Sequence, residues 1–302
     1  AYGILSPILP GFLAARGLTP GEIGLLLAAA GTVRLVVGPL AGAFADRNRA
    51  GRPVLAASVG LAGLAILAHL PGAGFWPLLG PALVAGGILF VAAAGAALAL
   101  PVQANVAKAD GWPIQSVAEL LRLSRFRRIL FAASLVIGAH ALHDAFAMIL
   151  WRDAGIGAGA AGLLWSGSVA AEVLVFLLAG PPLLARIGLP AGIAVAACAG
   201  ALRWAVLAST TAIPLLAAAE ALHGLSFALL HLACLGLIEA TAPPDLRATA
   251  LALYGTVALG LSGVLATLAS GALYGAFGAS AFWAMTALSL AALPLVPGLR
   301  DD

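Results

Sequence analysis

Charged side chains are scarce in this chain. Asp, Glu, Lys and Arg make up 9% of its 302 residues, whereas 63% are hydrophobic and the mean hydropathy is +1.09. A soluble domain of this length needs far more polar surface, so the composition excludes a soluble enzyme or binding domain. The sequence instead predicts an all-α polytopic membrane protein.

Cysteine is rare in this chain, and neither sign of charge is in strong excess. Cys198 and Cys234 lie within apolar stretches and are expected to be small buried side chains, so they indicate no redox compartment. The net charge is only +3, and the basic residues occupy short loops without interleaved aromatic residues. We therefore expect no nucleic-acid partner and no cofactor; the predicted partners are the lipid bilayer, a small molecule and protons.

Long apolar segments are what the chain does have. The first begins at Ala1, with no initiator Met and no basic leader, which favours a clipped spanning helix over a signal peptide. About ten segments reach the roughly 20 apolar residues that a bilayer requires. They are 1–15, 20–44, 53–71, 76–101, 129–151, 158–179, 188–208, 213–240, 247–273 and 278–297.

Lys and Arg predict the orientation of these segments. They gather in the loops near residues 48, 103–128, 186 and 245, whereas only Arg16 and Arg152 fall on the opposite side. The positive-inside rule places those loops and the C-terminus in the cytoplasm.

The apolar segments divide into two unequal groups. Residues 1–102 hold about four segments and residues 129–302 hold six, separated by the polar stretch 103–128. We expect two helical bundles joined by a cytoplasmic linker, with about two spans absent from the first bundle near residues 80–81. Within the linker, SVAELLRLSRF is predicted to be a short amphipathic helix at the membrane surface, or else a solvated segment.

A loop motif lies between the second and third segments. GPLAGAFADRNRAGRPVL, residues 38–55, contains Gly42, Asp46, Arg47 and Arg52. It resembles the G-x-x-x-D-R-x-G-R loop of the major facilitator superfamily, with about two additional residues before the Gly-Arg pair. The resemblance implies a two-bundle transporter fold in which these four residues form a cytoplasmic gate; the alternative is a turn that serves only the positive-inside rule.

Further segments resemble the phenylpropionate permease family, which is related to the lactose-permease-like proton symporters. The similar strings are PILPGFLAARGLTPGEIGLLLAAAGTVRLVVGPL in the first half and GAHALHDAF, GLLWSGSVAAEVLVF, ALRWAVLASTTAIPLL, EALHGLSFALLHLA and ALYGAFGASAFW in the second. The resemblance implies proton-coupled uptake of a small aromatic carboxylate such as 3-phenylpropionate across a bacterial inner membrane, by a monomer. The Tyr-Gly-x-Val-Arg segment typical of that family is missing.

Titratable residues interrupt the segment 213–240. On a helix, His223 lies about 60° to one side of Glu220 and His231 about 20° to the other, so the three share one face. Such groups face a bundle interior or a water-filled path, because exposing them to lipid is costly. This face is the first candidate functional site.

Neighbouring segments carry further candidates. In 129–151, His140 and Asp144 are four residues apart, with His143 between them as either a functional group or a structural hydrogen-bonding partner. Glu172 must carry a proton or form half of an ion pair, and Arg203 is its expected partner. Counting residues along each segment places Glu220 nearer the outer end of its own helix, whereas Arg203 lies nearer the middle of its own.

These observations lead to assigned roles. The alternatives are an efflux carrier, a sugar or nucleoside symporter, a non-transporting remnant, and, remotely, an intramembrane metal-dependent enzyme built on the HALHD segment. The candidates for proton coupling are Glu172, Glu220, His223, His140 and Asp144. The candidates for substrate binding are Arg203, Arg34, Trp165, Trp204 and His231.

Overall fold

The computed structural model describes residues 2–47 and 113–299, and within these ranges it contains helices and no strand. Its contacts divide the chain into two units, 1–16 with 33–108 and 17–32 with 109–302. The first unit holds α1 (Tyr2–Ala15) and the second part of α2 (Pro20–Arg47). The predicted all-α class is confirmed for the described residues, whereas the gap expected near residues 80–81 lies outside them.

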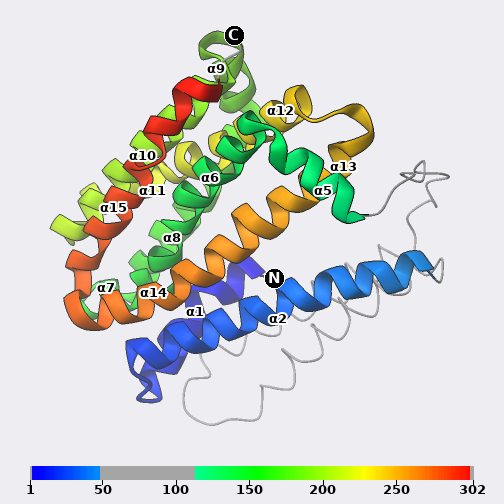
Figure 1. The fold of residues 1–302 in the computed structure, drawn as a ribbon. Helices are drawn as coiled ribbons and strands as arrows, with labels where there is room; N and C mark the ends of the chain where they lie inside the picture. The colour runs from blue at the N-terminus through cyan, green and yellow to red at the C-terminus, as the bar shows by residue number, and fades with distance from the viewer. Residues whose placement is uncertain (1, 48–112, 300–302) are drawn as a thin grey trace, which may run out of the picture. The chain divides into compact units, whose positions relative to one another are not determined.

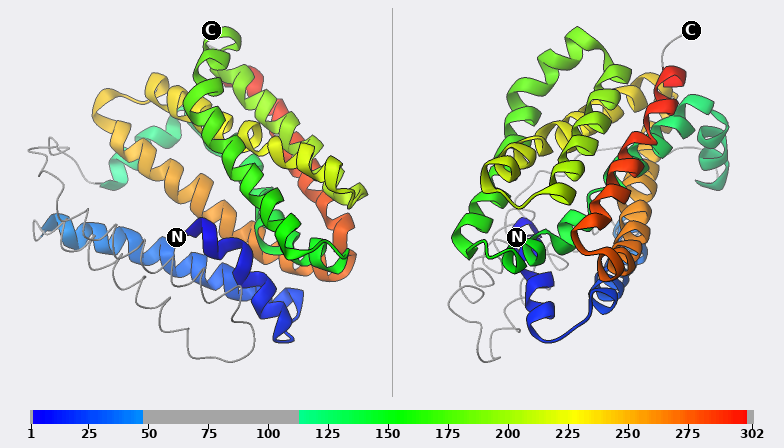
Figure 2. Two further views of the ribbon diagram at one scale, coloured as in Figure 1. Left: turned by 180° about the vertical axis from the view of Figure 1, so that it is seen from behind. Right: turned by 90° about the vertical axis from the view of Figure 1, so that its left-hand side faces the viewer.

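The second unit is a bundle of rods, several of which combine α-helix with a wider π-helical segment. This arrangement is seen from three directions in Figures 1 and 2. In chain order, the elements after α2 are α5 (Pro113–Arg122), α6 (Ser124–Gly138), α7 (Ala141–Asp153), α8 (Ala158–Leu174), η1 (Val175–Ala179), α9 (Gly180–Ile187), α10 (Leu189–Ser209), α11 (Ile213–Ala221), η2 (Gly224–Leu229), α12 (Leu230–Thr241), η3 (Pro244–Leu246), α13 (Arg247–Leu253), η4 (Tyr254–Leu261), α14 (Ser262–Phe277), η5 (Gly278–Ala281), α15 (Phe282–Leu290) and η6 (Leu293–Leu299).

Five helical stretches in the described ranges are long and apolar enough to cross a membrane. The last of them, Pro244–Leu299, reverses direction at Gly278, where α14 ends and the chain returns as α15 (Figure 1). The reversal uses a positive φ of 54° at Gly278, a conformation that glycine adopts without steric cost. The stretch therefore holds two antiparallel segments, which coincide with the predicted segments 247–273 and 278–297.

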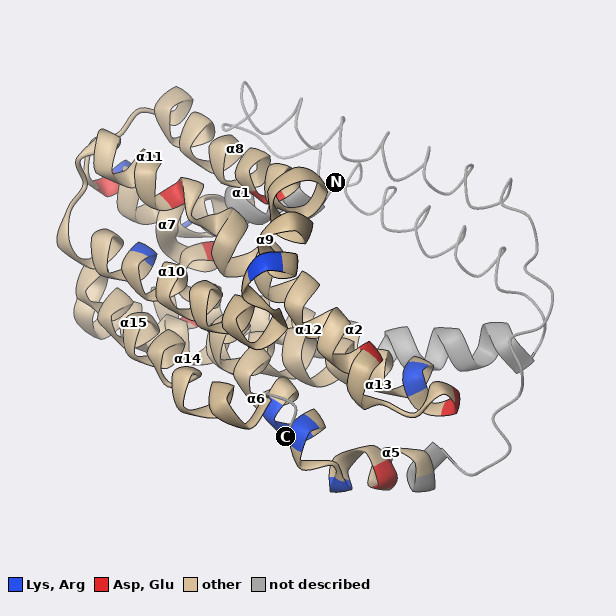
Figure 3. Ribbon diagram, turned by 90° about the horizontal axis from the view of Figure 1, so that it is seen from above, with Lys and Arg blue, Asp and Glu red and all other residues tan. Residues whose placement is uncertain are grey.

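Basic residues collect at one end of this bundle. Figure 3 shows basic residues on α5, on the first turn of α6, on α9 and on α13, which lie toward the same side of this view. Arg186 belongs to the last turn of α9, and Arg247 begins α13. The arrangement matches the side that the charge pattern predicts to be cytoplasmic.

The apolar segment predicted as one helix over 129–151 is broken in its middle. α6 ends at Gly138, and the His140 backbone N–H donates to the Ile137 carbonyl instead of continuing the α-helical ladder to Val136. The carbonyl of Val136 accepts from Nδ1 of His140 at 2.9 Å. The imidazole thus satisfies a backbone acceptor that the break would leave exposed to an apolar interior.

Close packing between α2 and α14 depends on two glycines. A Cβ built on Gly271 would lie 2.7 Å from the Pro20 carbonyl oxygen and 3.1 Å from Gly24 Cα. Small residues allow membrane helices to approach this closely.

We expect Gly271→Ala to destabilise the protein by about 1–3 kcal/mol, because the added methyl group meets backbone atoms that cannot rotate away. Gly263→Ala is the matched control on the same helix, since a Cβ there meets no atom within 4 Å. Thermal unfolding of both variants in detergent tests this expectation. Equal melting temperatures would contradict the close contact.

Candidate functional site

A fully buried ion pair lies at the centre of the second unit. Nη2 of Arg203, on α10, donates to Oε2 of Glu220, on α11, at 2.5 Å. The side chains of Arg203 and Glu220 are 0% and 1% exposed. Each charge is removed from water, so each depends on the other for neutralisation.

His143 extends this pair toward α7. Its Nε2 lies 3.0 Å from Oε1 of Glu220 and 3.1 Å from Nη2 of Arg203, and its Nδ1 lies 3.4 Å from Oδ1 of Asp144. His143 is buried, whereas the Asp144 side chain is 55% exposed. His143 therefore connects a buried carboxylate with an accessible one.

His223 extends the pair toward α8. Nη1 of Arg203 lies 2.9 Å from Nδ1 of His223, and Nε2 of His223 lies 3.3 Å from Oε2 of Glu172. A guanidinium can only donate, so Nδ1 accepts and the proton of the neutral imidazole resides on Nε2. His223 thus presents an N–H to Glu172, whose side chain is 26% exposed.

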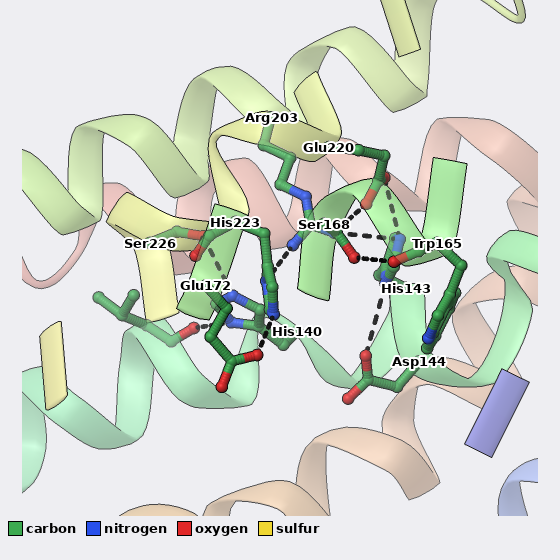
Figure 4. A network of polar contacts seen from close by, with 11 residues as sticks. His140, His143, Asp144, Trp165, Ser168, Glu172, Arg203, Glu220, His223 and Ser226 are labelled. Carbon is green, nitrogen blue, oxygen red and sulfur yellow. Dashed lines mark hydrogen bonds and ion pairs between the residues drawn. The ribbon is translucent and has the colours of Figure 1, made fainter. Parts of the chain in front are cut away.

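Together these residues form one continuous polar array across four helical rods (Figure 4). The carboxylates of Asp144 and Glu172, at its two ends, point to the same side, away from Arg203 and Glu220. We call the six residues the central array: Asp144, His143, Glu220, Arg203, His223 and Glu172.

His140 lies beside the central array. Its Nδ1 donates to Val136, so its Nε2 accepts, at 3.2 Å, from the hydroxyl of Ser226 in η2. The hydrogen bond joins the break between α6 and α7 to the π-helical segment that follows His223. Non-α backbone of this kind is often found at functional sites.

Aromatic rings enclose one part of the array. Trp165 stacks on His143 with ring centroids 5.0 Å apart and an interplanar angle of 17°, and it is only partly buried. Trp204 is fully buried, donates to Ser289 Oγ at 3.1 Å and lies 4.6 Å from the Arg203 guanidinium carbon. Of these two predicted substrate contacts, Trp165 alone has exposed surface in this conformation.

The predicted pairing of Glu172 with Arg203 is wrong. Arg203 pairs with Glu220, and Glu172 reaches it only through His223. The prediction placed Glu220 nearer the outer end because it counted depth along each helix separately. Depth counted along single helices does not determine which side chains meet across the bundle.

The predicted i,i+4 relation of His140 and Asp144 does not produce a side-chain pair. The Asp144 backbone N–H donates to the His140 carbonyl at 3.0 Å, as in an α-helix, but the Asp144 carboxylate lies against the neighbouring His143. Trp151 packs edge-on against His143, with ring centroids 5.9 Å apart.

His231 lies apart from the central array. Nδ1 of His231 donates to the Phe227 carbonyl at 3.1 Å, and its ring contacts Phe176, Phe227 and Tyr254. It shares a helix face with His223, with Phe227 stacked between them. Its predicted role in substrate binding remains a prediction.

The predicted residues of the first half are placed only in part. Arg34, Gly42, Asp46 and Arg47 all fall within α2, which ends at Arg47, whereas Arg52 lies outside the described residues. Their predicted roles in substrate binding and gating remain predictions.

Sequence reasoning undervalued His143 and missed Ser226. The sequence does not decide whether His143 has a functional or a structural role, because no pattern on its own helix indicates that a carboxylate from α11 lies beside it. Ser226 carried no signal, since a serine in an apolar helix often bonds its own backbone. In the described part of the chain, no group of three or more His, Cys, Asp and Glu side chains could hold a metal ion.

Apolar helical rods that are long enough to cross a membrane, packed around buried, paired charges, fit a polytopic membrane carrier fold of the major facilitator type. The chain belongs to the MFS_1 like family, whose model matches residues 89–285. The family and the relatives found are transporters, not enzymes.

One similar protein is the "Probable 3-phenylpropionic acid transporter" of Escherichia coli, which is 36% identical over 170 residues. The match spans 56% of this chain and 44% of that protein, so it covers less than half of the relative's length.

Solved structures show the same fold. A mutant of the nucleoside transporter NupG superposes with a TM-score of 0.60 at 17% identity, over 99% of this chain and 90% of that one. A second NupG structure gives a TM-score of 0.55 at 17% identity, over 98% of this chain and 86% of the other.

We expect Glu220→Gln to destabilise the protein by about 3 kcal/mol or more, because it leaves the Arg203 guanidinium buried without a counter-charge. Asp153→Asn is the matched control, since Asp153 pairs with Arg152 at 2.9 Å where both side chains are more than half exposed. Thermal unfolding in detergent measures both. The double variant Arg203→Gln with Glu220→Gln should recover part of the loss; no recovery would contradict mutual neutralisation.

Proposed function

We propose that this protein is a secondary active transporter that carries a small aromatic carboxylate together with a proton by alternating access. Membership of the family and the name of the 36% identical relative support the transport class and the acid substrate. The observation that carries the coupling is the position of Glu172, partly exposed and next to a neutral histidine, at one end of the central array.

Among the described residues, Glu172 has no Arg or Lys partner. Its side-chain contact is the N–H of a neutral His223, because Arg203 is already paired with Glu220. Its carboxylate is partly exposed, so protons can reach it, whereas Glu220 is enclosed. Glu172 can therefore gain and lose a proton without breaking an ion pair with an arginine.

This arrangement makes an anionic substrate dependent on a proton. A carboxylate that approaches ionised Glu172 is repelled, and the repulsion is strong where water is scarce. Once Glu172 is protonated, the repulsion disappears and its O–H can donate a hydrogen bond to the substrate carboxylate. Substrate and proton would then bind together and leave together.

The aromatic part of the substrate would lie against Trp165. This indole is partly exposed, although His143 stacks on one of its faces. Aromatic rings pair favourably by stacking or by edge-to-face contact. Arg203 instead keeps His223 and Glu220 in place, since both of its terminal nitrogens are occupied.

We expect Glu172→Gln to abolish substrate-driven alkalinisation in energised vesicles while it preserves exchange of substrate across the membrane. Gln cannot release a proton, yet it still offers a hydrogen-bond donor to a carboxylate. 3-Phenylpropionate is the probe, and uptake by Glu172→Gln should no longer depend on external pH.

Glu239→Gln is the matched control, because Glu239 is 73% exposed near the end of α12, remote from the central array. It should transport like the unchanged protein. If Glu172→Gln and Glu220→Gln both retain proton-coupled uptake, the assignment of coupling to the central array is wrong.

A further inference from the structure

His143 is the residue of the central array whose two ring nitrogens both face a carboxylate. Nε2 lies 3.0 Å from Glu220 and Nδ1 lies 3.4 Å from Asp144. A neutral imidazole carries one N–H, so in either tautomer an unprotonated nitrogen would face a carboxylate oxygen. Only an imidazolium donates to both.

The groups around His143 favour the positively charged imidazolium. Asp144 on its own helix and Glu220 on α11 are anionic, Arg203 on α10 is cationic, and Trp165 on α8 presents its ring face. Nη2 of Arg203 and Nε2 of His143 lie 3.1 Å apart, and each faces a different oxygen of the Glu220 carboxylate, so both can donate to that one group. An aromatic face within about 6 Å also stabilises a cation, and the Trp165 centroid lies 5.0 Å from that of His143.

We infer that His143 is a standing imidazolium, a positioning residue that holds Asp144 and Glu220 ionised while Glu172 alone changes protonation during transport. Charges then alternate along the array: Asp144 negative, His143 positive, Glu220 negative and Arg203 positive. These four sum to zero, so Glu172 is the one acidic group of the array left over. The inference that Glu172 alone changes protonation rests on the proposed function, whereas the charge of His143 does not.

The hydrogen bonds of the other described histidines require only one ring proton each. His140 and His231 each donate from Nδ1 to a backbone carbonyl, of Val136 and Phe227 respectively. His223 accepts on Nδ1 from Arg203 and carries its proton on Nε2. These assignments provide an internal reference for His143.

Nitrogen-15 spectra of the full chain, labelled at histidine and held in lipid, test the inference without any transport assay. At about pH 7, one ring should show two protonated nitrogens. Replacing His140, His223, His231 and His69 by Gln, one at a time, should each leave that signal in place, which assigns it to His143 by elimination.

Asp144→Asn should remove the negative charge that faces Nδ1 and convert the signal to a singly protonated ring, whereas Asp153→Asn on the same helix should not change it. A singly protonated His143 in the unchanged protein would overturn the inference and leave the proposed role of Glu172 standing.

Transport measurements test the positioning role. His143→Lys retains a cation and should keep substrate-driven proton uptake, whereas His143→Gln should lose at least about tenfold in coupled uptake. Equal uptake by the two variants would show that the charge of His143 is dispensable, even if the spectra show an imidazolium. Loss of proton coupling in Glu172→Gln is a separate outcome and decides the proposed function alone.

Discussion

The structure of the second unit depends on the neutralisation of one buried guanidinium. Arg203 has no exposed surface and remains charged under all ordinary conditions, so it must be met by a carboxylate and by further acceptors. Glu220 supplies the charge and His223 supplies a neutral acceptor, each from a different part of the same rod. Because Nη1 donates to His223, the tautomer of that neutral ring follows from this one cation.

The sequence predicted the rods well and the contacts between them in part. Apolar length was sufficient to place the segments of the second half, and the cost of burying charge correctly predicted that Glu172, Arg203, Glu220 and His223 gather together. The pairing within that group depends on which way each side chain points. The break after Gly138 and the π-helical segment Gly224–Leu229 change those directions, and neither has a periodicity that the sequence displays.

Backbone irregularity and polar chemistry coincide in this bundle. The break between α6 and α7 leaves a carbonyl that His140 satisfies, and the same ring accepts from Ser226 in the π-helical segment. Both irregular regions therefore share one histidine, which lies 5.4 Å, centroid to centroid, from His223. A movement of His223 would therefore act on two helices where the regular α-helical ladder of backbone hydrogen bonds is already interrupted, and these are the points at which a helix bends most easily.

Under the proposed function, the distribution of charge in the array would account for the joint transport of a proton and an anion. The cationic groups are buried and paired, whereas the accessible groups are the carboxylates of Asp144 and Glu172. Because its accessible groups are negatively charged, the array repels a free anion, so a cation must bind together with that anion. A proton on Glu172 meets that need without an additional metal or basic side chain, and it becomes the donor that an oxyanion prefers. Under the proposed function, selectivity for an acid and a requirement for a proton would be two consequences of one charge arrangement.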